Sequence, residues 1–219
     1  MGLIFNIAFK TISVIFYIFA GNSKMVKKYP WWKALTDYSL ALIMVVLFIP
    51  LFVILVILTS IDTGFPGIFT QKRVGREGKL FVIYKFQTYH SQTSRKSNFG
   101  RWMRKTKLDE LPQLFNILKG EMSFVGPRPD IPGYYNMLKG DERLVLRLKP
   151  GLTSEAGIKY RNESEILGSQ PDPLKYNDEV LFPDKVKMNL EYYHQLSFKT
   201  DILILLKTFS IIFIRKKSY

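Results

Sequence analysis

The sequence contains no cysteine and only two histidines among its 219 residues. Without cysteine the chain has no disulfide framework, no thiolate metal ligand and no cysteine nucleophile. His90 and His194 stand alone, without the spacing of a metal-binding pair, so each is expected to be a surface or packing residue. A phosphate-binding loop of the G-x-x-x-x-G-K-[ST] type is also missing. Carboxylates, arginines and lysines are therefore the candidates for chemistry.

Acidic residues are scarce, with 18 Asp and Glu against 32 Lys and Arg, which gives a formal net charge of +14. The chain is also 47% hydrophobic and 15% aromatic. Disordered basic tails lack such hydrophobicity, so a folded chain is expected. The charge suits nucleic acid, anionic lipid or a phosphorylated substrate. No zinc spacing, RNP-type pattern or basic zipper is present, so nucleic acid is not predicted as a partner.

Two long apolar segments indicate contact with a membrane. Residues 3–20, interrupted by Asn6 and Lys10, would form a helix of about 27 Å, close to the roughly 30 Å of a bilayer core. Whether this segment spans or lies on the membrane stays open. A signal peptide is not favoured, because no basic region precedes the segment and no A-x-A site follows it.

The second apolar segment, residues 40–58, contains no charge and predicts a membrane helix. Pro50 in its middle removes a backbone donor and predicts a kink. Basic residues lie both before the segment, at 24–33, and after it, at 72–79. A helix that enters, bends and leaves by the same face keeps both clusters in the cytoplasm. We therefore favour a re-entrant helix over a full span.

Residues 67–89 have the pattern of a β-hairpin, with two β-rich runs around the turn sequence "GREG". Leu80, Val82, Tyr84 and Phe86 share one face of the second run, and Lys85 points to the other. A lysine in such a position is often a solvated edge charge.

The stretch "KLDELPQLFNILKGEMSFVGPRPD", residues 107–130, contains two adjacent carboxylates before an apolar helical stripe. Pro112 is tolerated only in a first helical turn, so the helix is expected to start at about Asp109, at or near the N-cap. Gly120 supplies a stop signal. The positive end of the helix dipole would keep Asp109 and Glu110 ionised.

Acidic residues at a helix start are common stabilising choices, so this pair alone predicts no chemistry. Its surroundings change that interpretation. Arg101, Arg104 and Lys105 precede it, and the rigid sequence "GPRP" fixes Arg128, whose guanidinium suits phosphate. Two carboxylates plus phosphate oxygens make a plausible Mg²⁺ site, and an ionised carboxylate can attack phosphorus.

The last segment, residues 198–219, places apolar residues at helical spacing and ends in a basic tail. It suits an amphipathic helix in the membrane interface, while a core-packing helix stays an open alternative. The sequence therefore divides into residues 1–32, a membrane segment and linker; 33–64, the re-entrant helix; 65–197, a cytoplasmic catalytic domain; and 198–219, the interface helix. The predicted fold class is α+β and membrane-associated, with a helix-rich domain that carries a hairpin.

The motifs "FTQKRVGREGKLFVIYKFQT", "LDELPQLFNILKGEMSFVGPRPD" and "LKPGLT" resemble those of the bacterial sugar transferases that act on polyprenol phosphate. These are the small monotopic phosphoglycosyl transferases, and the similarity covers about residues 33–209. The resemblance implies a re-entrant helix with a proline bend. It also implies a location on the bacterial inner membrane, with the catalytic domain on the cytoplasmic face.

The resemblance further implies an activity and its residues. A sugar-1-phosphate would move from a nucleotide diphosphate sugar, usually a UDP-sugar, to undecaprenyl phosphate, with release of UMP. Asp109 would be the nucleophile, and Glu110 would assist by metal binding or proton handling, with Mg²⁺ held by both. The residues expected to bind phosphate or line the site are Arg104, Arg128, Lys85, Arg73 and Gln71.

The sequence departs from the family pattern at several positions. Gln87 occupies a position where the family usually has Arg or Lys, Tyr89 one where it usually has Met, and Ile49 one where it often has Ser. Residues 154–162 also differ from the usual Gly-aromatic-Ala and Asn-Gly-Arg stretches. The sugar, the downstream polymer and the oligomeric state are therefore left open. A non-catalytic basic scaffold that binds anionic lipid is the alternative function.

Overall fold

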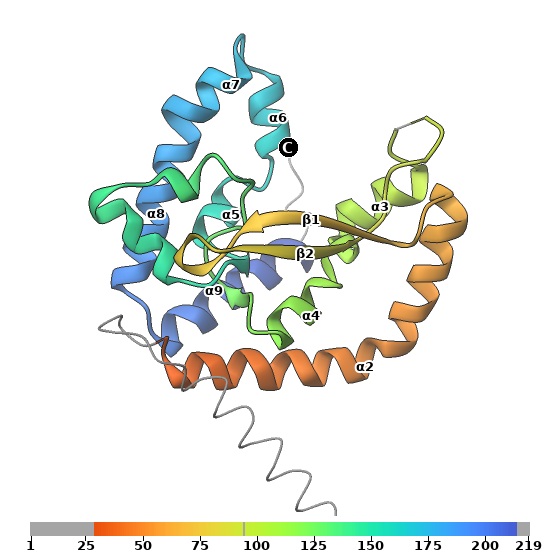
Figure 1. Ribbon diagram of the computed structural model, residues 1–219, viewed down its shortest axis with the longest axis horizontal. Helices are drawn as coiled ribbons and strands as arrows, with labels where there is room; N and C mark the ends of the chain where they lie inside the picture. Colours follow the sequence, from red (N-terminus) through yellow and green to blue (C-terminus); the bar gives the residue numbers. More distant parts are fainter. Residues whose placement is uncertain (1–28, 94, 214–219) are drawn as a thin grey trace, which may run out of the picture.

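The computed structural model describes residues 29–93 and 95–213. The apolar segment predicted at residues 3–20 and the basic tail beyond residue 213 lie outside the described residues. Figure 1 shows a long helix along one side of the molecule, a hairpin across its middle, and the remaining helices packed around the hairpin.

Helix α2 (Trp31–Thr63) has 33 residues and would be about 50 Å long if straight. It bends between its two halves (Figure 1), and Pro50 lies inside it. Proline lacks the N–H for the helical ladder, and its ring clashes with the carbonyl four residues earlier, which accounts for the bend. The kink predicted from Pro50 is thus present.

The outer surface of α2 is apolar. Ile43, Leu47, Val53 and Ile57 are each more than half exposed. By length and composition, α2 is the one helix among the described residues that could cross a membrane, and only 22% of its most apolar stretch is buried. A core helix of a soluble protein would bury most of that stretch. The bend agrees with a re-entrant course, whose placement in a bilayer stays a prediction.

The predicted hairpin is confirmed. Strands β1 (Ile68–Val74) and β2 (Leu80–Phe86) pair antiparallel around the short 3₁₀ turn η1 (Arg76–Gly78). The inward face of β2 carries Phe81 and Ile83, which are buried, and Lys85. Lys85 is not a solvated edge charge, the common alternative for such a position, because its side chain is only 18% exposed and has an acidic partner.

The central motif forms α3 (Asn98–Thr106), a 3₁₀ turn η2 (Leu108–Glu110) and α4 (Gln113–Leu118). The predicted helix start at Asp109 was wrong, since Pro112 is the N-cap of α4. Pro112 has no N–H to continue the helical ladder backward, and the residues before it close with tighter i to i+3 bonds. Asp109 and Glu110 therefore lie in a single tight turn ahead of the helix.

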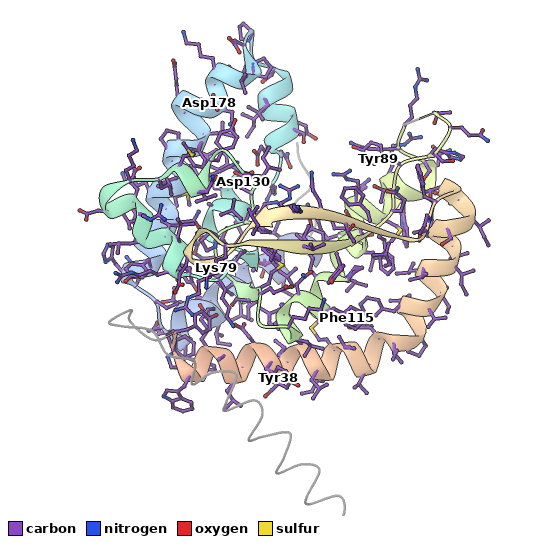
Figure 2. All side chains as sticks on the ribbon, viewed as in Figure 1. Tyr38, Lys79, Tyr89, Phe115, Asp130 and Asp178 are labelled. Atoms are coloured by element: carbon purple, nitrogen blue, oxygen red, sulfur yellow. The ribbon has the colours of Figure 1, made fainter. Side chains whose placement is uncertain are left out.

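Helix α4 lies between the hairpin and α2 (Figure 1) and packs against both. Phe115 of α4 meets Phe52 of α2 with ring centroids 5.3 Å apart, and Figure 2 shows Phe115 on the side of α4 that faces α2. One apolar core joins Ala41 and Phe52 of α2 to Ile83 of β2 and Leu114 of α4. The long apolar helix and the segment that carries the carboxylate pair thus share a core.

The rest of the chain supplies one more strand pair and a set of helices. Strand β3 (Ser123–Val125) pairs parallel with β4 (Gly151–Thr153). A side chain at Gly126 would lie 2.2 Å from the Lys149 carbonyl oxygen, so glycine is needed where these two segments meet. The remaining elements are η3 (Tyr135–Met137), η4 (Gly140–Arg147), α5 (Glu155–Lys159), α6 (Glu163–Gly168), α7 (Pro173–Tyr176), the π-helical η5 (Asn177–Leu181), α8 (Phe182–His194) and α9 (Phe198–Phe213).

Helix α9 combines features of both predicted alternatives. Asp201 and Ile204 are buried against the core, whereas Leu203, Leu206 and Phe209 are exposed. The helix therefore packs on the core through one side and presents an apolar face on the other. The architecture as a whole is the predicted helix-rich α+β fold with a small hairpin and one long apolar helix.

Buried charges fix the start of α2 to the domain. Lys33, which is 1% exposed, forms an ion pair with Asp201 of α9, and Asp201 also accepts a hydrogen bond from the Tyr192 hydroxyl. The Asp37 carboxylate accepts hydrogen bonds from the Ser123 hydroxyl and the Phe124 N–H, both at 3.0 Å. These bonds join α2 to α9 and to β3.

This arrangement predicts that substitution of one member of the ion pair lowers stability more than substitution of both members. Lys33→Met leaves the Asp201 charge buried without its cation, which costs about 3–5 kcal/mol in comparable pairs. We expect the thermal unfolding midpoint in detergent to fall by roughly 10 °C. Lys33→Met/Asp201→Asn removes both charges while keeping an acceptor for Tyr192, so it should recover more than half of that loss. A double variant as unstable as Lys33→Met would show that the ion pair does not dominate this contact.

Candidate active site

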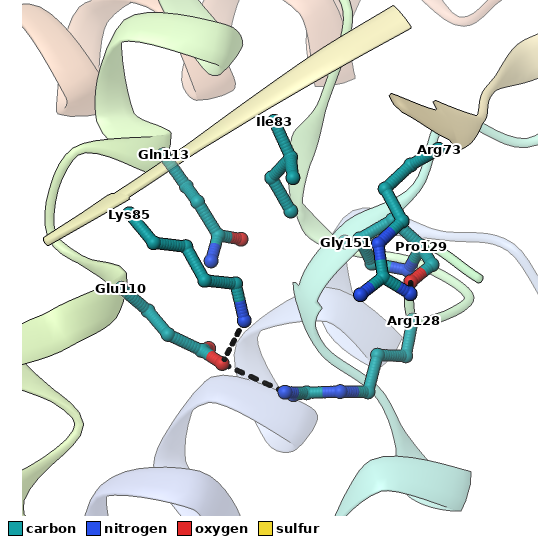
Figure 3. A pocket seen from close by; sticks show the side chains of 8 residues that line it. All are labelled: Arg73, Ile83, Lys85, Glu110, Gln113, Arg128, Pro129 and Gly151. Carbon is teal, nitrogen blue, oxygen red and sulfur yellow. Dashed lines mark hydrogen bonds and ion pairs between the residues drawn. The ribbon is translucent and has the colours of Figure 1, made fainter. Parts of the chain in front are cut away.

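A cavity of about 40 Å³ lies where the hairpin, the turn before α4 and the loop after β3 meet (Figure 3). Its polar lining is mostly cationic, although it also holds one carboxylate. The residues that line it are Arg73, Ile83, Lys85, Glu110, Gln113, Arg128, Pro129 and Gly151. The structure thus brings together four of the residues predicted from sequence, from three separate segments.

Glu110 is the centre of the charge arrangement. Its Oε1 accepts hydrogen bonds from Lys85 Nζ at 3.1 Å and from Arg128 Nη2 at 2.7 Å, as Figure 3 shows. Burial alone would raise the pKa of Glu110, but the charges of Arg128 and Lys85 outweigh it and lower the pKa to about 2. Glu110 is therefore ionised at neutral pH, and burial in turn lowers the pKa of Lys85 despite the attraction of Glu110.

Asp109, the neighbour of Glu110, has a very different environment. The residue is 5% exposed, and its Oδ1 is buried without a hydrogen-bond partner in the part of the chain that the structure describes. Burial, and then the negative charge of Glu110, raise the pKa of Asp109 above its ordinary value. The expected stabilisation of ionised Asp109 by a helix N-terminus is not found, because the residue precedes α4 by a full turn.

Arg73 and Gln71 lie on β1 next to the cavity. Arg73 Nη2 donates to Gln71 Oε1 at 2.6 Å, and Arg73 Nη1 donates to the carbonyl of Pro129 at 3.5 Å. Gln71 is exposed and does not line the cavity. Its contact with the site is therefore through Arg73, which it orients.

Arg104 lies outside the cavity lining. It is an exposed residue of α3, and its guanidinium stands 5.7 Å from the ring centroid of Tyr89 and donates to the Tyr89 hydroxyl at 3.4 Å. Figure 2 shows Tyr89 beside α3. The charge of Arg104 still lowers the pKa of Asp109 in part, so the two residues are electrostatically linked. Tyr89, where the family pattern has Met, is the residue that holds Arg104.

Sequence reasoning missed two polar residues of α4. Gln113, which lines the cavity, and Asn116 are 2% and 0% exposed. The apolar stripe through Leu114 indicated which helix face is buried, but Gln113 and Asn116 were not assigned to it. Their spacing of three residues, which places both on one helix face, was the available signal.

A model of the bacterial sugar transferase family matches residues 28–215 of this chain. The matched region includes the hairpin, the carboxylate pair and the loop that carries Arg128.

Several curated proteins are similar to the chain. It is 33% identical to a galactosyl transferase of Streptococcus agalactiae over 172 residues. This aligned region is 68% of this chain and 35% of that protein. It is 31% identical over 210 residues to an undecaprenyl-phosphate galactose phosphotransferase of Salmonella typhimurium, which covers 84% of this chain and 40% of that protein. An exopolysaccharide production protein of Sinorhizobium fredii is 28% identical over 210 residues, with 84% and 86% covered. The chain thus spans less than half of the first two relatives and most of the third.

The opposite environments of the two carboxylates predict opposite effects on stability. Asp109→Asn removes a buried charge that has an unpartnered oxygen and is repelled by Glu110, so we expect the unfolding midpoint to rise by about 2–4 °C. Glu110→Gln leaves Lys85 without its counter-charge and should lower the midpoint by a similar amount or more. Differential scanning fluorimetry in detergent measures both. Destabilisation by Asp109→Asn equal to that by Glu110→Gln would contradict this description of the pair.

The lowered pKa of Glu110 also predicts a pH dependence of stability. Its folded pKa of about 2 lies below the ordinary 4.5, so its contribution is complete above pH 4.5 and is lost as the pH falls toward 2. The difference in unfolding free energy between the native protein and Glu110→Gln should therefore be constant from pH 8 to 5 and shrink below 4.5. Denaturant titrations at each pH test this, and a difference that grows on acidification would contradict it.

Proposed function

This chain belongs to the bacterial sugar transferase family, and we propose on that basis that it transfers a sugar-1-phosphate from a UDP-sugar to undecaprenyl phosphate, with release of UMP. The observation that carries the proposal is the cavity that Arg73, Lys85 and Arg128 line together with Glu110, whose neighbour Asp109 lies outside the lining. Reactions of phosphoryl groups depend mainly on positioning and charge neutralisation, which this arrangement supplies. The product would begin the assembly of a surface glycan.

The proposed reaction has two displacements. An oxygen of Asp109 attacks the sugar-side phosphorus of the donor, the bond from that phosphorus to the bridging oxygen breaks, and UMP leaves with that oxygen. A phosphate oxygen of undecaprenyl phosphate then attacks the same phosphorus, and the Asp109 carboxylate leaves. Each displacement is easier than a direct reaction between two anionic substrates, which is the usual benefit of a covalent intermediate.

The environments of the two carboxylates support this division of roles. Glu110 Oε1 is already engaged by Lys85 and Arg128, and its low pKa makes it a weak nucleophile. Asp109 has an oxygen without a partner among the described residues, and its raised pKa makes it the more basic of the two. Asp109 is therefore the proposed nucleophile, and Glu110 the proposed positioning group for the two cations.

The donor must widen the site when it binds. The cavity of about 40 Å³ is much smaller than the roughly 300–1,000 Å³ of typical ligand pockets, and Asp109 is only 5% exposed. Arg128 is the cation best placed to move, because its side chain is 50% exposed. If a donor diphosphate draws Arg128 away from Glu110, Arg128 exchanges one anionic partner, the carboxylate, for another, the diphosphate.

A magnesium ion is part of the proposal, and the residues fit one. No group of three or more potential acidic, histidine or cysteine ligands occurs among the described residues. Mg²⁺ commonly uses one or two carboxylates together with substrate phosphates, however, and the unpartnered Asp109 oxygen and ionised Glu110 provide such a pair. When bound, the ion would neutralise phosphate charge.

The proposed location is the cytoplasmic face of the bacterial inner membrane. The exposed apolar surfaces of α2 and α9 would lie in the lipid and bring the site to the level at which a polyprenol phosphate headgroup is found. The shared core of α2 and α4 would hold the carboxylate turn close to that level.

The proposal is tested by incubation of the purified protein with Mg²⁺ and a panel of UDP-sugars. Intact-mass spectrometry should show a phosphosugar adduct, and peptide mapping should place it on Asp109. Release of UMP should become catalytic only when undecaprenyl phosphate is added. Asp109→Asn should form no adduct and lose at least about 10³-fold in turnover, as expected for removal of a nucleophile.

Asp141→Asn is a matched control, because it changes an acidic residue of η4 outside the cavity and should leave turnover unchanged. Absence of both adduct and UMP release across the whole panel would overturn the proposal. Full turnover by Asp109→Asn would contradict its role as nucleophile, whereas binding to anionic lipid without any turnover would favour the non-catalytic scaffold.

A further inference from the structure

We infer that Asn116 is a positioning residue that places Lys85 and Arg128 on Glu110. None of the hydrogen bonds given for the Asn116 side chain goes to these three side chains, and Asn116 is fully buried. Its side chain instead joins the strand that carries Lys85 to the helix that follows Glu110. The inference rests on the proposed function in one respect, because that function assigns the group of Lys85, Glu110 and Arg128 a role in the reaction.

The side-chain amide of Asn116 forms hydrogen bonds with the backbone of β2, on the edge of β2 that does not pair with β1. Strand β1 occupies one edge of β2, and within residues 29–93 and 95–213 the hairpin sheet has only these two strands. On the other edge, the Tyr84 N–H donates to Asn116 Oδ1 at 3.1 Å, and Asn116 Nδ2 donates to the Val82 carbonyl at 2.7 Å. Tyr84 and Val82 are two residues apart, so their peptide groups face the same way. One side-chain amide thus replaces the backbone of a third strand.

These bonds fix the residue next to them. Lys85 follows Tyr84 directly, and its Nζ reaches Glu110 at 3.1 Å. Glu110 lies in the turn that leads into α4, the helix that carries Asn116. The distance between the ammonium and the carboxylate therefore depends on how β2 is docked on this segment, and Asn116 makes the polar part of that docking.

Asn116 also fixes the chain that leads to Arg128. Its second Nδ2 hydrogen is donated to Glu121 Oε2 at 2.8 Å, and its backbone carbonyl accepts from the N–H groups of Glu121 and Met122. Strand β3 begins at the next residue, Ser123, and runs into the loop that holds Arg128. Three of the four hydrogen-bonding positions of the amide are used, including both donors, so an aspartate or a leucine at this position would lose at least two of these bonds.

If Asn116 had a purely structural role, its substitution would lower stability by the same amount whether or not Lys85 is present. A double-mutant cycle separates the two cases, because coupling appears only between residues that act on each other. Asn116→Leu should lower kcat/KM for UMP release about tenfold when Lys85 is present, and at most about twofold in the Lys85→Met background. Lys85→Met alone should lower it about 100-fold, which leaves measurable turnover.

Asn189→Leu is the matched control. Asn189 is also buried, at 2% exposure, and its Nδ2 donates to the Tyr135 hydroxyl at 2.8 Å, away from Lys85. Its effect on kcat/KM should be the same in both backgrounds. If Asn116→Leu does not fold, Asn116→Asp is used, which keeps an acceptor for the Tyr84 N–H and removes both donors.

The same cycle measured on the unfolding midpoint needs no turnover. Asn116→Leu should lower the midpoint more with Lys85 present than in the Lys85→Met background. If no donor is turned over, the proposed function fails, but this second cycle still tests Asn116. Equal effects of Asn116→Leu in both backgrounds, on turnover or on the midpoint where turnover is absent, would overturn the inference.

Discussion

The structure depends on the different environments of two adjacent carboxylates, Asp109 and Glu110. Glu110 shares one oxygen between Lys85 and Arg128, whereas Asp109 is buried with an oxygen that has no partner among the described residues. Removing a charged group from water is costly unless a partner compensates, and the charge of Glu110 is compensated better than that of Asp109. A buried carboxylate in this position gains most from a cation or from any reaction that removes its negative charge.

The rest of the fold holds this pair in place. Lys85 comes from the hairpin, the carboxylates from the turn before α4, and Arg128 from the loop after β3. A shared core and the buried polar contacts of Lys33 and Asp37 attach the same elements to α2. Uncompensated buried groups reduce stability, and functional sites commonly carry that cost. Helix α2 therefore supports the elements that carry the site and also presents an apolar surface.

Much of this arrangement could be predicted from the sequence, for identifiable reasons. Alternating residues around "GREG" predicted the hairpin, and an uncharged run with Pro50 predicted a bent apolar helix, because both signals are local. Resemblance to a family indicated Lys85, Arg73, Glu110 and Arg128, and the structure brings these four together.

Other features could not be predicted because they depend on contacts between distant segments. The helix start was placed too early, since the pattern around Pro112 does not distinguish a first helical turn from a 3₁₀ turn before it. The buried face of β2 was not decided by alternation, because both faces are largely apolar. The burial of Asn116 follows only from the docking of α4 on β2. The contrast between Asp109 and Glu110 likewise comes from which of them the cations reach.

The most direct measurement of this contrast is a ¹³C NMR titration of the two carboxyl carbons, assigned with Asp109→Asn and Glu110→Gln. As the pH falls from 8 to 4, the Asp109 resonance should begin to titrate above its ordinary pKa of 3.8, while the Glu110 resonance should stay in its ionised position. A Glu110 resonance that titrates first, or two resonances that titrate together near pH 4, would contradict the account.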